Sequence, residues 1–108
     1  MRKQIPVIAI CLFLGACASH YGAARITSIP SGAEVINADD GSNLGVTPTT
    51  VIWKDSSTKR KFPTLYIKKD GYYIKTTPFW LHMKHSSSEK AKKSPDIVKV
   101  VLVKKGND

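Results

Sequence analysis

The sequence predicts an all-β domain, built as a small antiparallel β-sandwich, behind a short apolar N-terminal segment. Two observations predict this fold. Short runs of β-branched and aromatic residues recur along the chain, and turns rich in glycine, proline and aspartate separate them. After residue 17, no stretch combines helical periodicity with capping residues. Several short strands joined by regular turns are typical of a sandwich or a barrel.

The expected strands follow one another closely along the chain. Residues 25–29 are β-branched and end at Pro30, whose fixed φ and missing N–H stop a strand. Residues 34–37 precede the sequence Asp-Asp-Gly-Ser, which has the turn chemistry of a hairpin. Further strands are expected over residues 49–53, 64–68, 72–76 and 97–103, with residues 79–81 extending the sheet.

The last of these segments has the strongest β propensity in the chain and indicates which of its faces is buried. Lys99 shares a face with Val101 and Val103, so we expect the opposite face to point into the core. That face carries Val98, Val100 and Leu102.

The N-terminus has the pattern of a secretory signal peptide. Two basic residues, Arg2 and Lys3, precede an apolar run over residues 5–14 that ends in small residues. The run is too short for a membrane-spanning helix, which needs about 20 apolar residues. Its last part, Leu14-Gly15-Ala16-Cys17, resembles the lipobox of bacterial lipoproteins.

The lipobox resemblance implies a lipid anchor at Cys17. In that family the cysteine thiol receives a diacylglycerol, cleavage follows just before it, and the new amino terminus is acylated, with palmitate as a typical chain. Ala18 and Ser19 follow in place of an Asp retention signal, which favours the outer membrane of a Gram-negative cell. The alternative is an ordinary secreted protein cut at the small residues around Cys17.

Positive charge gathers in the second half of the chain. The formal net charge is +9, and fourteen of the fifteen Lys and Arg residues after residue 16 lie from Lys54 onward. Such a field steers anionic partners. For an exported protein these are lipopolysaccharide, anionic lipid head groups or acidic glycans, and nucleic acid is not expected. The alternative is that the lysines keep a small β-domain soluble and protect its strand edges.

Two groups of side chains are the candidate binding residues. Basic residues interrupt or follow the expected strands, and exposed aromatic rings beside them suit sugar stacking. The candidates for anion binding are Lys59, Arg60, Lys61, Lys68 and Lys69, and those for glycan stacking are Tyr73 and Trp80.

Three short motifs, taken in order, resemble the PEGA domain. They are Pro30-Ser31-Gly32-Ala33, Gly45-Val46-Thr47-Pro48 and Lys69-Asp70-Gly71-Tyr72, and a valine-rich strand closes the pattern. The resemblance implies a small sandwich similar to transthyretin-like modules. Members of the family are mostly accessory modules of cell envelopes without a common catalytic activity, and a surface or glycan-binding role is expected for them.

The sequence thus divides into three parts. Residues 1–16 are expected to be the lipoprotein signal peptide, residues 17–24 a lipidated tether, and residues 25–105 a PEGA-like β domain with a flexible insertion at 84–95. Removal of residues 1–16 from the 108 leaves 92, enough for one small domain. Cys11 leaves with the signal and Cys17 is acylated, so no disulfide is expected.

No pattern of catalytic or cofactor-binding residues emerges from the sequence. His82 and His85 lack a third metal ligand nearby, and Asp39 and Asp40 lack the further oxygens of a calcium loop. We therefore expect a non-enzymatic binding or structural module of the envelope, without metal or cofactor. The alternative is an accessory lipoprotein of a larger envelope or secretion assembly that acts through protein–protein contacts.

Overall fold

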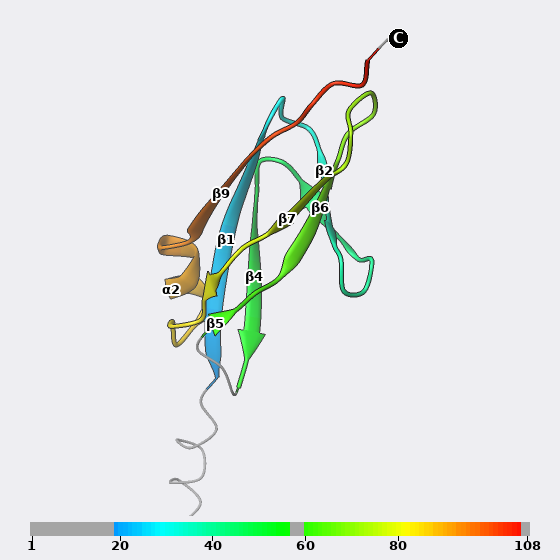
Figure 1. Ribbon diagram of the computed structural model, residues 1–108. Helices are drawn as coiled ribbons and strands as arrows, with labels where there is room; N and C mark the ends of the chain where they lie inside the picture. Colours follow the sequence, from blue (N-terminus) through cyan, green and yellow to red (C-terminus); the bar gives the residue numbers. More distant parts are fainter. Residues whose placement is uncertain (1–18, 57–59, 107–108) are drawn as a thin grey trace, which may run out of the picture.

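The described residues form a mostly β fold with three small sheets and one short helix. A computed structural model describes residues 19–56 and 60–106. Within them the sheets have three, four and two strands (Figure 1). The mostly β class agrees with the sequence prediction, whereas the pairing of the last strand and the ends of several elements differ from it.

The three-stranded sheet has the order β4 (Thr49–Asp55), β1 (His20–Ile29) and β9 (Asp96–Val101). β1 runs antiparallel to β4 but parallel to β9. The prediction of a purely antiparallel fold was therefore wrong for this pair. Parallel neighbours need a long crossover connection, and the segment before Asp96 supplies it by returning the chain to the middle of β1.

Helix α2 (Ser88–Lys93) forms part of this crossover. Ser87 caps it, because the Ser87 hydroxyl accepts a hydrogen bond from the backbone N–H of Lys90 at 3.2 Å. Ala91 is fully buried, and α2 packs on β1 and β4. The segment 84–95, which the sequence analysis describes as a flexible insertion, thus contains a capped helix with one buried side chain.

The first strand begins earlier than the sequence suggested. β1 starts at His20, so most of the predicted tether 17–24 belongs to the sheet, and Cys17 lies outside the described residues. The small residues at the start of β1 resemble a linker in the sequence. In the structure they fit a strand whose two faces are both closely packed. Ala23 and Ala24 are both buried.

The four-stranded sheet has the order β3 (Asn43–Val46), β2 (Glu34–Asn37), β6 (Thr64–Lys68) and β7 (Lys75–Pro78), all antiparallel. The predicted hairpin after β2 is confirmed, although its second strand, β3, was not predicted. The strand predicted over residues 72–76 is displaced along the chain to Lys75–Pro78, because Tyr72 and Tyr73 pair instead with the chain beyond β9. The N–H of Tyr73 donates to the carbonyl of Val103 at 2.9 Å.

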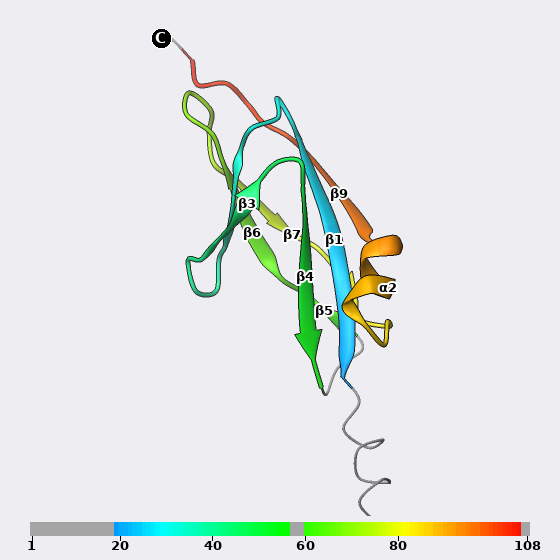
Figure 2. The same ribbon diagram turned by 180° about the vertical axis from the view of Figure 1, so that it is seen from behind.

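The third sheet contains only β5 (Arg60–Lys61) and β8 (Leu81–His82), which are antiparallel. These short strands lie toward the end of the domain where β1 begins, whereas the C-terminus lies at the opposite end (Figures 1 and 2).

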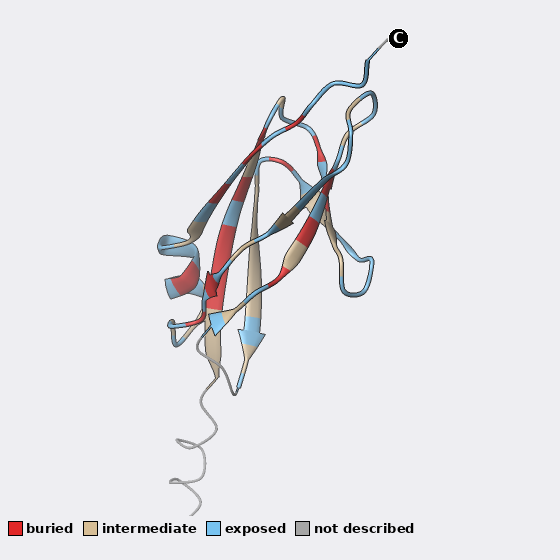
Figure 3. Cartoon of the chain, in the orientation of Figure 1, coloured by how far each residue is buried: buried red, intermediate tan, exposed pale blue. Residues whose placement is uncertain are grey.

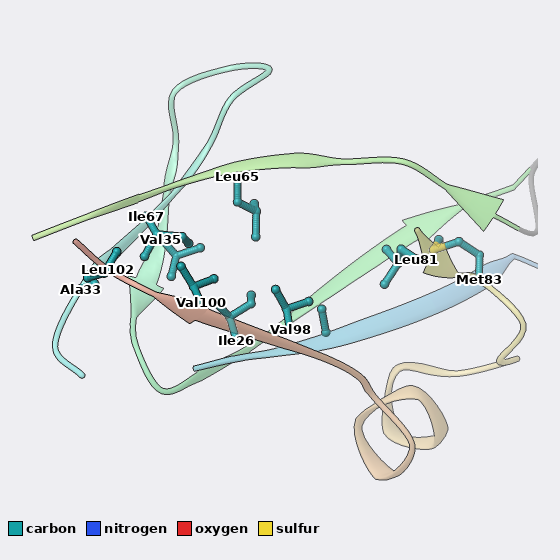
Figure 4. Close-up of a cluster of buried hydrophobic side chains, with 11 residues drawn as sticks. Ile26, Ala33, Val35, Leu65, Ile67, Leu81, Met83, Val98, Val100 and Leu102 are labelled. Carbon is teal, nitrogen blue, oxygen red and sulfur yellow. The ribbon is translucent and has the colours of Figure 1, made fainter. Parts of the chain in front are cut away.

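The core lies between the three-stranded and the four-stranded sheet (Figures 3 and 4). The predicted inward face of the last strand is confirmed, because its three residues are at most 7% exposed. Leu81 and Met83, which are fully buried, close the core toward the start of β1. The buried cluster consists of Ala24, Ile26, Ala33, Val35, Leu65, Ile67, Leu81, Met83, Val98, Val100 and Leu102.

A chain of hydrogen bonds through two buried hydroxyls joins the end of β1 to the segments around it. The N–H of Ala33 donates to Oγ1 of Thr47 at 2.9 Å. The hydroxyls of Thr47 and Ser28 lie 2.6 Å apart, and that of Ser28 donates to the carbonyl of Pro30 at 2.7 Å. Because the single hydroxyl hydrogen of Ser28 is donated to the carbonyl of Pro30, the hydroxyl of Thr47 must be the donor to the hydroxyl of Ser28. The hydroxyls of Ser28 and Thr47 therefore each donate one hydrogen bond and accept another.

We predict that Thr47→Val destabilises the protein by about 1–3 kcal/mol, because it leaves the buried N–H of Ala33 without an acceptor. Thr47→Ser keeps the hydroxyl and is the matched control, with a smaller expected loss. Urea unfolding followed by tryptophan fluorescence measures both. A Thr47→Val variant as stable as the unsubstituted protein would contradict the role assigned to this hydroxyl.

Candidate functional site

The structure divides the predicted basic residues between two places. Arg60 and Lys61 form β5, whereas Lys68 ends β6 and Lys69 follows it. Lys59 lies outside the described residues. The whole of β6 separates the two pairs, so the described basic residues do not form one site.

The two predicted aromatic residues separate in the same way. Trp80 immediately precedes β8, next to β5, whereas Tyr73 lies near the chain that leaves β9. The structure therefore places Trp80 with Arg60 and not with Tyr73. We take the surface around Trp80 as the candidate site.

Three side chains form a continuous exposed cluster at β5 and β8, which we call the aromatic–arginine cluster: Arg60, Phe62 and Trp80. The guanidinium carbon of Arg60 lies 4.9 Å from the centre of the Trp80 ring. The rings of Phe62 and Trp80 are 4.6 Å apart, centre to centre, and tilted by 42°. Trp80 is 55% exposed and Phe62 is 54% exposed. Large apolar rings thus remain available to a ligand beside a cation.

The register of the two-residue sheet explains why these side chains meet. Arg60 pairs with His82 and Lys61 with Leu81, so Phe62 and Trp80 face each other one step further along. The sequence prediction missed Phe62. Its signal was its spacing of two residues from Arg60, because side chains two residues apart on a strand lie on the same face.

Ion pairs and close packing fix β5 and β8 in place. Nζ of Lys61 lies 3.1 Å from a carboxylate oxygen of Asp55, at the end of β4. One carboxylate oxygen of Asp96 accepts a hydrogen bond from the backbone N–H of His82 at 2.8 Å, and the other lies 3.2 Å from Nδ1 of the His82 ring. β8 also approaches β1 very closely, since a Cβ on Gly22 would lie 2.6 Å from the carbonyl oxygen of His82.

The second basic pair lies beside a shallow open depression of about 200 Å³. Its charges are balanced, because two carboxylates accompany the two lysines, and Glu34 pairs in register with Lys68. An anion would meet little net positive charge there, so this surface is a weaker candidate than the cluster. The depression is lined by Gly32, Glu34, Lys68, Lys69 and Asp70.

The residues considered for metal binding have structural partners. His82 lies beside Asp96, and His85 exchanges backbone hydrogen bonds with Tyr21. Residues 19–56 and 60–106 contain no group of three or more side chains placed to hold a metal ion. Ser42 donates to the carboxylate of Asp40 through its backbone N–H and its hydroxyl, and these bonds hold the pKa of Asp40 below its usual value.

No further functional assignment follows from the helices of the described residues or from a comparison with known proteins. No helix among the described residues is long and apolar enough to cross a membrane. A search of protein-family models, curated proteins and solved structures found no match to the chain.

We predict that Gly22→Ala destabilises the protein by about 1–3 kcal/mol, because the new methyl group collides with the backbone of β8. It should also shift the emission of Trp80, measured in a Trp53→Phe background, since β8 must move. The control is Gly71→Ala, which strains a residue with a φ of +86° but has no atom within 4 Å of its new methyl group. An unchanged Trp80 emission in Gly22→Ala would contradict the close packing of β8 on β1.

Proposed function

We propose that the protein is a lipid-anchored, non-enzymatic module of the bacterial envelope that binds an anionic envelope component through the aromatic–arginine cluster. Acylated Cys17 would hold it in the outer membrane. The observation that carries the proposal is the half-exposed stack of Trp80 on Phe62 with Arg60 over the Trp80 ring. Such a surface combines a cation with apolar faces, which suits a ligand that carries phosphate or carboxylate groups on a sugar.

The finer fold assignment, a PEGA-like and transthyretin-like sandwich, is part of the same proposal. It is supported by the contact between two of the three motifs that carry the resemblance. The hydroxyl of Thr47 accepts a hydrogen bond from the N–H of Ala33, and the backbone carbonyl of Thr47 accepts one from the N–H of Gly32 at 3.0 Å. Motif residues that look unrelated in the sequence therefore share one structural task, as expected for the signature of a family.

Arg60 is the central residue of the proposed binding surface. A guanidinium can bind a phosphate or carboxylate in two-point geometry while its plane stays on an aromatic ring. Lys61 adds charge, although Asp55 offsets part of it. Lipopolysaccharide and acidic glycans are the envelope components with matching chemistry.

A second candidate function is that of an accessory lipoprotein in a larger envelope assembly. It is supported by exposed apolar side chains of β1, of β9 and of the chain just beyond β9. Each of them is more than half exposed, and exposed apolar residues that are neighbours favour a protein contact. They are Ile29, Ile97, Val101 and Val103.

We predict that Cys17→Ser abolishes acylation and membrane retention, because only the thiol accepts the lipid. Labelling cells with an alkynyl fatty acid and fractionating their membranes measures both effects. Cys11→Ser is the matched control and should label normally. Undiminished labelling of the Cys17→Ser protein would rule out the lipid anchor.

We predict that binding to lipopolysaccharide-containing vesicles weakens steeply with salt, since screening shortens to about 8 Å at 0.15 M. The probe protein is residues 17–108 carrying Cys17→Ser, so that the anchor cannot bind instead. Arg60→Gln with Lys61→Gln should reduce the affinity by at most about 30-fold, because each basic residue near an anionic surface contributes about 1 kcal/mol and Asp55 offsets part of the charge of Lys61.

The control for this experiment is Lys68→Gln with Lys69→Gln, which removes the same charge from the balanced depression. Its effect should be clearly smaller. Equal losses in the two double variants would show that net charge alone governs binding, and equal binding to neutral vesicles would favour the protein-partner function.

A further inference from the structure

We propose that the aromatic–arginine cluster rests on the lipid head groups of the same leaflet that holds acylated Cys17, so that the domain lies against its own membrane. This inference rests on the proposed lipid anchor and narrows the proposed anionic ligand to phospholipid or lipopolysaccharide phosphates at the bilayer surface. Three features carry it: the length of chain before β1, the position of the cluster, and the chemistry of its side chains.

The short segment between Cys17 and β1 limits how far the domain can lie from the lipid anchor. Only Ala18 and Ser19 separate Cys17 from His20, where β1 begins. Three residue steps span at most about 11 Å even when fully extended. The start of β1 is therefore held within about a nanometre of the acylated residue, and the surface at this end of the domain is the one that meets the head groups.

The aromatic–arginine cluster lies at this end. His20 pairs in register with Asp55, and Asp55 binds Lys61 of β5 at 3.1 Å. The residue that follows Lys61 is Phe62. β8, which follows Trp80, packs on Gly22 of β1. Three residues beyond β8, His85 exchanges backbone hydrogen bonds with Tyr21. Both strands that carry the cluster are thus tied to the first residues of β1 (Figure 1).

The side chains match the chemistry of a bilayer surface. Tryptophan rings favour the membrane–water interface, phenylalanine adds apolar surface of the kind that inserts there, and arginine binds phosphate in two-point geometry. A second basic and aromatic pair lies at the same end, where Nζ of Lys54 is 5.8 Å from the centre of the Tyr21 ring. Asp55 at this end lies 3.1 Å from Nζ of Lys61, and Asp96 lies 3.2 Å from Nδ1 of His82.

A short tether also makes weak surface contacts effective. A group held near its ligand by a short tether experiences a high effective concentration of that ligand, so individually weak contacts suffice for stable docking. A soluble glycan would have no such advantage at this surface. The geometry therefore favours the membrane over a glycan as the ligand of this cluster.

The test places the acylated protein in vesicles of phosphatidylglycerol and phosphatidylethanolamine that contain brominated lipids, which quench tryptophan on contact. Two single-tryptophan variants are compared. Trp53→Phe leaves Trp80 as the reporter. Trp80→Phe leaves Trp53, which lies at the same end of the domain but packs against the core and against Phe79. We expect a several-fold larger loss of emission for Trp80 than for Trp53.

Arg60→Gln in the Trp53→Phe background should lower the quenching of Trp80, whereas Lys69→Gln should leave it unchanged. Equal quenching of both tryptophans, or no quenching of either, overturns the inference. The inference is also overturned if brominated lipids leave Trp80 unquenched while a soluble acidic glycan changes the emission of Trp80. That result would leave the proposed function intact.

Mass spectrometry of the purified protein keeps the two proposals apart. An acylated protein with unquenched Trp80 overturns only the docking of the domain on its membrane. A protein without acyl chains on Cys17 overturns the lipid anchor, and the docking proposal falls with it.

Discussion

The hydroxyl of Thr47 is the constraint on which the rest of the fold depends. It lies fully inside the protein, where an unpaired polar group is costly, and it joins the end of β1, the start of β2 and the connection from β3 to β4. These segments belong to both larger sheets, so the hydrogen bonds of Thr47 help to fix how the sheets face each other across the core. The described residues contain no cysteine, and such noncovalent links take the place of a disulfide.

Much of the fold could be predicted from local sequence, because β-branched runs and turn residues act over a few positions. β2 and β6 have the expected bounds, and the inward face of β9 follows from Lys99 on the other face. The parallel pairing of β1 with β9 could not be predicted, because it depends on where the crossover returns the chain. The start of β1 could not be predicted for a related reason. Its small residues suggested a tether, because close packing and a flexible linker favour the same amino acids.

The candidate site shows the same division between local and non-local information. Arg60 and Trp80 could be chosen individually because an exposed cation and an exposed ring have recognisable sequence surroundings. Their meeting depends on a ladder of only two residues in each strand, which no propensity predicts. Conversely, Lys68 and Lys69 seemed part of one basic group in the sequence, yet β6 carries them to a surface where carboxylates balance their charge.

The parallel pairing of β1 and β9 has a mechanical consequence. The chain enters the fold at the beginning of β1 and leaves it beyond the end of β9, at opposite ends of the domain (Figure 2). A pulling force applied between the start of β1 and the end of β9 therefore runs along these two adjacent strands. Their register spans Ala24–Ile29 against Asp96–Val101, and such a force shears these backbone hydrogen bonds together instead of opening them one at a time.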